Sequence, residues 1–412
     1  MVPLTLPYLA ALTPPGWEIR LIDEELTDVD FQTPVDLVAI TTWTLNSFRA
    51  YEIADRFRER KVPVMIGGPH TCFYAEETAE HCDAVGIGEG EKIWPVMLKD
   101  AAQRRLQKIY RAGPLTPLEG LPLPRYDLLD FRKQGFFKTF SVQTSRGCPF
   151  RCEFCSERFY LGETYRYRPV REVIEEIRAT RSRNLLFADS NFAGKVDHTL
   201  ELMEALIPLK VRWSSLWPAH LCTNHKFMDL AQRSGLLHVN IGIESIEPEA
   251  LREMNKKANQ VRQYQEILRN LRQRGISYSL NFIFGWDKEK EDVFQSTLAF
   301  LQQNKVPVAY FNILTPHKGT PLYDRMKAED RIINIDQIGR WPGFFCHIKP
   351  KHASPEEMEE KLKETYRKFY SYSSMLARLP LPLTKAHIAS WVINWSQRKI
   401  FRAGSQENFE DY

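Results

Sequence analysis

The sequence predicts an α/β protein in which two parallel sheets follow one another and a helical region ends the chain. Strand-like and helix-like runs alternate over residues 1–103, and a more regular alternation extends over residues 134–316. Parallel sheets covered by helices produce such an alternation. Residues 104–133 contain four prolines and are interpreted as a linker, and residues 317–412 form a mainly helical extension.

Composition places the chain among ordinary globular proteins. Of its 412 residues, 43% are hydrophobic and 26% are charged, and the formal net charge of +4 gives no sign of a nucleic-acid partner. No run of about 18 apolar residues predicts a membrane span. The first residues are uncharged but lack the basic start of a signal peptide, so we expect a cytoplasmic protein.

Residues 1–103 predict a Rossmann-like sheet with helices on its faces. A helix is expected at Asn46–Lys61 and another near the start of the chain. Because the chain opens with that helix and not with a strand, we expect this domain to be short by one strand. The predicted strands are Trp17–Glu24, Asp36–Trp43, Val62–Gly68 and Ala84–Gly88.

Glycine-rich turns follow two of these strands. One is Gly67-Gly68-Pro69-His70, and the other is Gly88-Glu89-Gly90-Glu91. Ligands of open α/β sheets bind at the carboxyl ends of the strands, where glycine lets the backbone approach closely. The competing interpretation is that these glycines only make tight turns.

The region 134–316 predicts a partial (β/α)6 barrel, because six strand-like runs alternate with five helix-like runs. The predicted strands are Thr139–Thr144, Asn184–Asp189, Val211–Leu216, Leu237–Glu244, Ile276–Gly285 and Val308–Thr315. The predicted helices are Val170–Thr180, Val196–Leu209, Lys226–Ser234, Gln260–Arg274 and Glu291–Asn304.

The extension contains a charged helix, Pro355–Tyr372, and a more apolar run, Leu376–Trp395. Tryptophans and basic residues in and after that run could form an interfacial surface for a membrane. We favour the interpretation that they cover the barrel or a partner protein. These residues are Trp391, Trp395, Arg398 and Lys399.

The strongest chemical signal is the motif Cys148-x3-Cys152-x2-Cys155. Soft thiolates suit iron–sulfur clusters, and three of them would leave one iron of a cubane open to a small molecule. A structural zinc site usually has four protein ligands, and a ferredoxin-like electron carrier also needs a fourth cysteine. The other four cysteines are scattered singly, so both alternatives rank lower.

The position of the cysteine motif also supports an iron–sulfur site with an open iron. The motif follows the first predicted strand of the barrel, where βα folds place their active sites. A strand, Ser-Arg-Gly, the three cysteines and Phe154 before the last of them together resemble the radical S-adenosylmethionine (SAM) superfamily. The resemblance implies a [4Fe-4S] cluster on Cys148, Cys152 and Cys155. It also implies that the open iron binds SAM, which reduction splits to a 5′-deoxyadenosyl radical.

The resemblance extends to the ends of later strands and implies SAM contacts there. Asp189 and Asn191 follow the second strand, although both also suit a helix N-cap. Glu244 and Ser245 end the fourth strand, where a carboxylate needs a hydrogen-bonding partner. The predicted SAM-binding residues are Phe154, Asp189, Asn191, Glu244, Ser245, Phe284 and Gly285.

The N-terminal region resembles the cobalamin-binding domain of one large radical SAM class, which includes anaerobic Mg-protoporphyrin cyclase and hopanoid methylases. The histidine motif that ligates cobalt in methionine-synthase-like domains is absent, and many members of the class lack it. The apparently missing strand leaves open whether the domain still binds cobalamin. The residues implied are Thr41, Thr42, Gly67, Gly68, Pro69, His70, Gly88, Glu89, Gly90 and Glu91.

The resemblance therefore implies a radical SAM enzyme, most simply one that methylates an unactivated carbon with cobalamin. A radical cyclase or another lipid- or tetrapyrrole-modifying enzyme is the alternative within the class, and a non-catalytic metal module is the alternative outside it. RNA or peptide modification ranks low, because the tail has neither a basic run nor a second cysteine cluster. The expected partners are a small-molecule substrate and an electron donor such as flavodoxin or ferredoxin.

Overall fold

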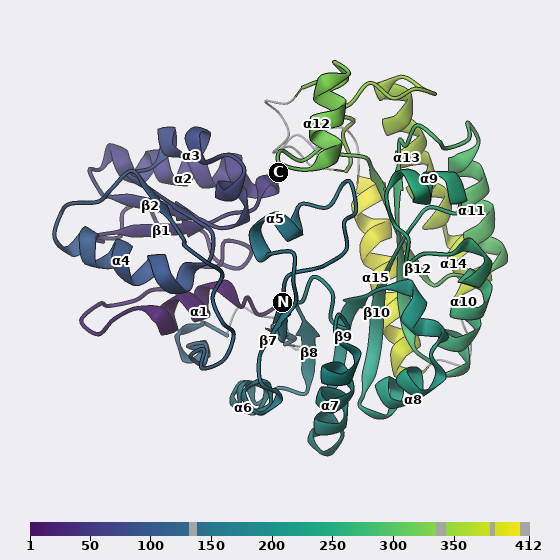
Figure 1. Ribbon diagram of the computed structural model, residues 1–412, viewed down its shortest axis with the longest axis horizontal. Helices are drawn as coiled ribbons and strands as arrows, with labels where there is room; N and C mark the ends of the chain where they lie inside the picture. The colour runs from purple at the N-terminus through teal and green to yellow at the C-terminus, as the bar shows by residue number, and fades with distance from the viewer. Residues whose placement is uncertain (132–137, 335–342, 380–383, 404–412) are drawn as a thin grey trace. The chain divides into compact units, whose positions relative to one another are not determined.

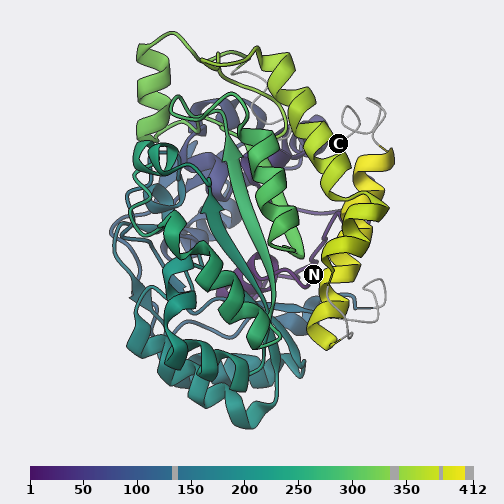
Figure 2. The ribbon, with the colours of Figure 1, turned by 90° about the vertical axis from the view of Figure 1, so that its right-hand side faces the viewer.

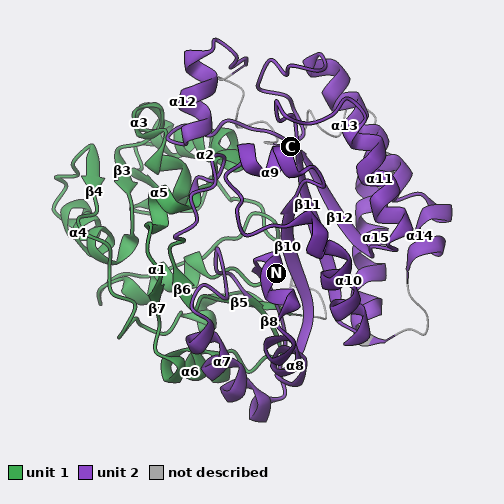
Figure 3. Cartoon of the chain, turned by 45° about the vertical axis from the view of Figure 1, so that its right-hand side comes forward, with its two compact units in different colours: residues 1–148, 157–186 green, residues 149–156, 187–412 purple. Residues whose placement is uncertain are grey.

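The structure is a computed structural model that describes residues 1–131, 138–334, 343–379 and 384–403. The chain divides into two compact units, which are coloured separately in Figure 3. Unit 1 comprises Met1–Cys148 and Glu157–Leu186, and unit 2 comprises Pro149–Ser156 and Phe187–Tyr412.

Unit 1 contains a four-stranded sheet in which every neighbouring pair of strands is parallel. The strands, in their order across the sheet, are β1 (Val38–Thr41), β2 (Val64–Gly67), β3 (Ala84–Ile87) and β4 (Ile109–Arg111). The helices before β4 are α1 (Thr5–Leu12), α2 (Ser47–Glu59), α3 (Ala75–His81) and α4 (Gly90–Ala102). The doubly covered sheet that the sequence predicts is therefore present.

Side chains of β2 alternate between the two faces of this sheet. Val64 and Ile66 join a buried cluster with Phe57 of α2, whereas Met65 joins a second cluster with Met97 of α4. Figure 1 shows α2 and α3 on one side of the sheet and α4 on the other. Burial on both faces explains why the strands are continuous apolar runs.

Two predictions about this region are corrected. Trp17–Glu24 is not a strand of any sheet, and its Trp17 instead packs against the buried cluster that contains Met65 and Met97. Ile109–Arg111, within the predicted linker, is instead the fourth strand of the sheet. The first strand of the sheet begins at Val38, so helix α1 does precede it, as expected.

A six-stranded sheet, with its strands in the order β12-β11-β10-β9-β8-β5, confirms the predicted partial barrel. Its members are β5 (Phe140–Val142), β8 (Asn184–Phe187), β9 (Arg212–Trp217), β10 (Leu236–Glu244), β11 (Ser277–Phe284) and β12 (Val308–Ile313). Between them lie α6 (Val170–Thr180), α7 (Val196–Leu206), α8 (His225–Arg233), α10 (Tyr264–Gln273) and α11 (Val293–Gln303). Each predicted strand and helix of this region is present.

Shorter elements surround the strand ends, and they were not predicted. They are β6 (Ser145–Arg146), α5 (Glu157–Leu161), β7 (Arg166–Tyr167) and α9 (Pro248–Glu253).

The helical extension packs within unit 2. Its helices are α12 (Pro321–Ala328), α13 (Pro355–Phe369), α14 (Tyr372–Arg378) and α15 (Lys385–Ala403). The Tyr366 hydroxyl of α13 bonds the N–H and C=O of Phe311, and the Tyr370 hydroxyl bonds those of Ala309. The two tyrosines therefore satisfy the outer edge of β12, which would otherwise be unpaired.

The predicted apolar run Leu376–Trp395 is two helices and not one, because α14 ends at Arg378. Figure 2 shows α15 in yellow beside the green helices of unit 2. Its residues Ser390 and Asn394 are buried, whereas Val392 and Trp395 are exposed. Within the described residues, no helix is both long and apolar enough to cross a bilayer.

Candidate active site

The first cysteine of the motif is held by a tight backbone contact within unit 1. The Cys148 N–H donates to the carbonyl of Gly162 at 3.1 Å. Gly147 adopts φ +89°, and a Cβ there would lie 2.1 Å from the carbonyl oxygen of Thr164. Only glycine fits this position, so the Ser-Arg-Gly sequence before Cys148 has a geometric reason.

The remainder of the cysteine loop is anchored within unit 2. The Glu153 N–H donates to the carbonyl of Met254 at 3.0 Å, and the Asn255 side-chain amide donates to the carbonyl of Arg151 at 2.7 Å. The Glu153 carbonyl in turn accepts from Leu322 of α12 at 3.1 Å. All three thiols of the motif are partly exposed, so a ligand can reach them.

An ion pair lies beside this loop at the carboxyl end of β10. Lys256 Nζ lies 2.5 Å from Glu244 Oε1, and the two side chains are 19% and 7% exposed. Burial lowers the pKa of Lys256, but the charges of Glu244, Cys152 and Cys155 together raise it above its ordinary value. Lys256 is therefore a fixed cation close to the motif's sulfurs.

Glu244 has a strained backbone conformation. Its φ is +67°, and the register between β10 and β11 shifts between Gly242 and Glu244. A Cβ on Gly242 would lie 2.3 Å from Glu244 Oε1, so the carboxylate occupies the space that this glycine leaves. A non-glycine residue held at positive φ is uncommon and tends to mark functional sites.

Among the buried polar atoms of unit 2 that have no hydrogen-bond partner in the described part of the chain, four belong to residues that follow β8, β10 or β11. The Asn259 amide nitrogen donates to the carbonyls of Gly242 and Ile243, both at 2.8 Å, but its oxygen is unsatisfied. Buried polar groups are normally paired, so such atoms suit a bound polar ligand. They are Asn191 Oδ1, Asn259 Oδ1, Trp286 Nε1 and Glu289 Oε1.

The loop after β11 is closed by Glu289. Its Oε2 accepts the N–H of Gly285 at 2.8 Å and that of Trp286 at 3.2 Å. Burial raises the pKa of Glu289 to about 8, so this carboxyl group is mainly protonated at neutral pH. The Trp286 ring packs edge-on against Phe154 of the cysteine loop, with ring centroids 5.9 Å apart.

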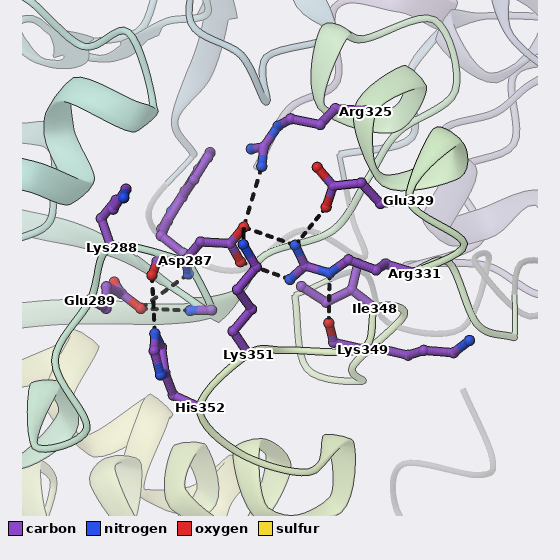
Figure 4. Close-up of polar contacts among 12 residues, drawn as sticks. Asp287, Lys288, Glu289, Arg325, Glu329, Arg331, Ile348, Lys349, Lys351 and His352 are labelled. Carbon is purple, nitrogen blue, oxygen red and sulfur yellow. Dashed lines mark hydrogen bonds and ion pairs between the residues drawn. The ribbon is translucent and has the colours of Figure 1, made fainter.

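Asp287 ties the same loop to the C-terminal elements, as Figure 4 shows. Three cations surround this carboxylate: Arg331 at 2.7 Å, Lys351 at 3.0 Å and Arg325 of α12 at 3.5 Å. Burial raises the pKa of Asp287, but the bonds from Arg331 and Lys351 outweigh it and lower the pKa. The loop that carries Gly285 and Trp286 is therefore fixed by two carboxyl groups: Glu289 bonds its backbone, and Asp287 pairs with the C-terminal cations.

The other predicted SAM-binding residues take different positions. Asp189 and Ser245 are buried at the ends of β8 and β10. The Phe284 side chain packs in the aromatic core against Phe294, at 4.1 Å between centroids, so only its backbone is left for a ligand. Gly285 has φ +109° and turns the chain directly after β11.

The predicted glycine turns of unit 1 lie at the carboxyl end of its sheet. Thr41 of β1 pairs with Gly67 of β2, and the Thr42 N–H donates to the Gly67 carbonyl at 3.0 Å. Gly68 has φ +107°, and a Cβ there would lie 2.6 Å from the Thr42 carbonyl oxygen. Gly88 has φ +92° and leaves only 2.9 Å between such a Cβ and Ala112.

His70, which follows Pro69 at the end of β2, uses both of its ring nitrogens within unit 1. Nε2 lies 2.7 Å from the Tyr51 hydroxyl, Nδ1 lies 3.2 Å from the Thr44 hydroxyl, and the ring stacks on Tyr74. Burial lowers the pKa of His70 to about 4. These bonds leave His70 as an internal residue of the fold and not a group directed at a ligand.

Glu89 and Glu91 are likewise engaged. Each carboxylate bonds to Arg146 within unit 1, and Gly90 between them would place a Cβ 3.2 Å from Leu9. Large apolar side chains are exposed instead in the segment after β1: Trp43 is 56% exposed, and Leu45 is 47% exposed. This end of the sheet therefore offers glycine backbone and apolar surface.

Within the described residues, no three His, Cys, Asp or Glu side chains converge as ligands of a single metal ion. Each cysteine of a cubane binds a different iron, so such convergence is not what a [4Fe-4S] site requires.

Comparison with known proteins identifies the family. Residues 142–301 match the model described as the radical SAM superfamily. Over 97% of this chain and 89% of the relative, the sequence is 30% identical to the bacteriochlorophyllide d C-12(1)-methyltransferase of Chlorobaculum tepidum. The chain belongs to the radical SAM superfamily.

Two further similarities concern the function and the fold. The anaerobic magnesium-protoporphyrin IX monomethyl ester cyclase of Rubrivivax gelatinosus is 23% identical over 92% of this chain and 72% of its own length. The radical SAM methyltransferase TsrM of Kitasatospora setae, solved with cobalamin and a [4Fe-4S] cluster, superimposes with a TM-score of 0.66. That match has 19% identity and covers 88% of this chain and 82% of TsrM, which supports the fold.

Family membership confirms the predicted recognition and shows that this radical SAM protein is an enzyme that uses SAM and an iron–sulfur cluster. The donor set fits both groups. Three soft thiols suit the cluster, and the Glu244–Lys256 pair with the unsatisfied amide oxygens of Asn191 and Asn259 suits a polar nucleoside.

Four residues of this site were not predicted from the sequence, and one of them is Trp286, directly after the predicted Gly285. Lys256 and Asn259 lie in an irregular segment after α9, and Glu289 lies in the loop after β11. Neither segment has a periodic pattern that would single out one polar residue. The useful signal is proximity to a predicted strand end, which marks Glu289 but not Lys256.

Proposed function

We propose that the enzyme methylates an unactivated carbon of a tetrapyrrole, using SAM, a [4Fe-4S] cluster and cobalamin. The observation that carries this proposal is the similarity to a bacteriochlorophyllide methyltransferase, which extends through the N-terminal sheet as well as the cysteine region. When bound, these groups supply reductive cleavage of SAM and a transferable methyl group.

In this proposal Cys148, Cys152 and Cys155 hold the cluster. The loop that carries the last two is fixed by bonds to residues after β10 and to α12, so the sulfurs are held before any ligand binds. Such preorganisation keeps reacting atoms within near-contact distance.

Glu244 and Lys256 would receive the amino-acid end of SAM. Their opposite charges complement its ammonium and carboxylate groups, because Glu244 attracts the first and Lys256 the second. The amide oxygens of Asn191 and Asn259 and the indole N–H of Trp286 would take the remaining polar groups. Gly285, which Glu289 holds in place, would offer backbone to the adenine.

The glycine turns of unit 1 would hold the corrin. Gly68 and Gly88 leave the close approach that a wide, flat ligand requires, and the exposed Trp43 and Leu45 offer apolar surface beside them. Both His70 nitrogens are engaged, so we propose that His70 does not ligate cobalt but shapes the turn.

The reaction needs an external one-electron donor, for which flavodoxin or ferredoxin is suitable. We propose that the enzyme acts in the cytoplasm, where cysteines stay reduced.

The test is anoxic turnover of reconstituted protein with SAM carrying a deuterated methyl group, a reductant, cobalamin and a bacteriochlorophyllide. The expected product carries one deuterated methyl group, and 5′-deoxyadenosine forms with it. Formation of 5′-deoxyadenosine without methylated tetrapyrrole would contradict the proposed substrate, and absence of both would contradict the proposed activity.

Ring closure is the second candidate, because the cyclase of Rubrivivax gelatinosus is similar over most of the chain. The same experiment separates the two functions when Mg-protoporphyrin monomethyl ester is offered as the substrate. A cyclase product contains no label from SAM, whereas a methylated product does.

A further inference from the structure

We propose that Arg146 is a positioning residue that fixes Cys148, the first of the three proposed cluster ligands, relative to the turn Gly88–Glu91 within unit 1. This inference rests on the proposed function, because that turn is proposed to contact the corrin. Arg146 lies two residues before Cys148 and is the last residue of β6, so its placement sets where the cysteine loop begins.

The Arg146 guanidinium makes three contacts, each with a different side chain. Nε donates to Gln143 at 2.7 Å, Nη1 lies 3.1 Å from Glu89 Oε1, and Nη2 lies 2.7 Å from Glu91 Oε1. A planar fork that uses separate nitrogens in this way permits one orientation only. The two glutamates come from the N-cap and the first turn of α4.

A second arginine completes the cluster. Arg166, which pairs with Arg146 across β6 and β7, lies 2.7 Å from Glu89 Oε1 and also donates to the carbonyls of Thr116 and Leu161. Glu89 further accepts the Thr116 N–H at 2.6 Å, and Glu91 accepts from the Tyr8 hydroxyl at 2.8 Å. Each carboxylate therefore has several donors.

The four charges are buried and sum to zero. The side chains of Arg146, Glu89, Glu91 and Arg166 are 10%, 5%, 7% and 15% exposed. Buried ion pairs add little stability compared with apolar residues of the same size, and one established use of them is to fix a single arrangement. Here the arrangement that is fixed joins Cys148 to Gly88 and Gly90, all within unit 1.

The distance between Cys148 and the turn Gly88–Glu91 matters because, in the proposed reaction, the SAM-derived radical and the corrin must act on the same substrate carbon. A displacement of about 1 Å can reduce a rate about a hundredfold. Gly147 lies between Arg146 and Cys148, and its left-handed backbone is packed against the carbonyl of Thr164. The position of Arg146 therefore constrains the position of Cys148. A loosened Arg146 should therefore leave the cluster bound but alter its distance from the corrin.

The test compares Arg146→Lys with Arg125→Lys in the full chain, reconstituted with iron, sulfide and cobalamin. Lysine keeps the charge but cannot reach Gln143, Glu89 and Glu91 at once. Arg125 is a matched control, because it belongs to the same unit and pairs with Asp127 at the surface, where it is 48% exposed. Glu91→Gln, which keeps the shape of the glutamate, is the second variant.

The main readout is the distribution of cobalt–cluster distances, measured by pulsed EPR on the cob(II)alamin and reduced-cluster spins. Iron content and thermal midpoint report on folding, and the rate at which SAM changes the spectrum of the reduced corrin reports on function. For Arg146→Lys and Glu91→Gln we expect a shifted or broader distance distribution and a rate lowered roughly tenfold or more. Iron content should stay within about twofold, and Arg125→Lys should match the wild type.

An unchanged distance distribution in both variants would overturn the inference. Equal loss of iron, thermal stability and rate in both would also overturn it, because it would assign the cluster of charges to folding alone. If the wild type binds no corrin, the proposed function fails and the inference fails with it. That result is distinct from a change seen only in the variants.

Discussion

The two regions that are proposed to bind cofactors, one in each unit, differ in how their polar side chains are paired. In unit 1, two of the polar side chains predicted from the sequence to face the corrin already have partners: His70 bonds Tyr51 and Thr44, and Glu89 bonds two arginines. At the strand ends of unit 2, buried polar atoms of Asn259 and Glu289 lack partners among the described residues.

This difference suits two kinds of ligand. A broad corrin can be held by close backbone approach and apolar surface, which Gly68, Gly88 and the exposed Trp43 provide. A small zwitterion such as SAM needs charges and hydrogen bonds, which Glu244, Lys256 and the unsatisfied amides provide. Substitutions that weaken the binding of one ligand and leave the other bound test whether the two regions bind different cofactors.

The largest effect is expected from Cys152→Ala. Removing one of three thiolate ligands should lower iron from about four atoms per chain to below one and abolish formation of 5′-deoxyadenosine. Iron analysis and product chromatography measure both. Cys222→Ala is the control, because Cys222 is a buried single cysteine of the same unit. Normal 5′-deoxyadenosine formation by the Cys152 variant would remove the basis of the assignment.

Gly68→Ala should act on the corrin alone. The added methyl group would lie 2.6 Å from the Thr42 carbonyl oxygen at a φ of +107°, so the turn must move, at a cost of about 1–3 kcal/mol. We expect cobalamin affinity, measured by absorbance titration, to fall about tenfold or more, with iron content unchanged. Gly113→Ala is the control, because nothing lies within 4 Å of its Cβ position. Equal cobalamin affinity in both variants would contradict the corrin placement.

Glu244→Gln should act on SAM alone. Loss of one charge-assisted contact, worth about 1.5–3 kcal/mol, should raise the dissociation constant of SAM roughly tenfold or more. The cluster's visible absorbance should remain. Glu249→Gln provides a control, since Glu249 forms an exposed pair with Arg252. If absorbance and SAM affinity fall together, Glu244 has a structural role and this side of the comparison is wrong.

The smallest effect on the cofactors is expected from His70→Gln, which should change folding stability and not the corrin spectrum. The unfolded chain protonates His70 near pH 6.5, whereas the folded chain does so only near pH 4. Folding stability should therefore fall as pH drops from 7 to 5, by about 2 kcal/mol from this residue. Urea unfolding should show a weaker pH dependence in His70→Gln than in His225→Gln, which replaces an exposed histidine. A changed cob(II)alamin EPR spectrum would instead show cobalt ligation.

Much of the fold was predictable because periodicity and strand length are local properties. Helix α6 matches its predicted range, and the six barrel strands were found within a few residues. The two wrong strand assignments depend on which segments lie side by side in the fold, and a local pattern does not contain that information. Trp17–Glu24 has a strand-like composition but joins no sheet, and Ile109–Arg111 is a strand only because β3 offers it an edge.

The candidate site was predictable where a motif carries the chemistry, as in the three cysteines. It was not predictable where distant residues meet. Lys256 joins Glu244 across twelve positions, and Arg146 meets Glu89 across 57. No spacing rule links such residues, because the fold alone brings them together.

The most direct test of the account is the EPR spectrum of the reduced, reconstituted cluster before and after SAM is added. With three cysteine ligands, one iron is open to SAM, so the spectrum should change on addition and iron should approach four atoms per chain. A spectrum that SAM leaves unaltered, or a preparation that holds only one metal ion per chain, would contradict the account.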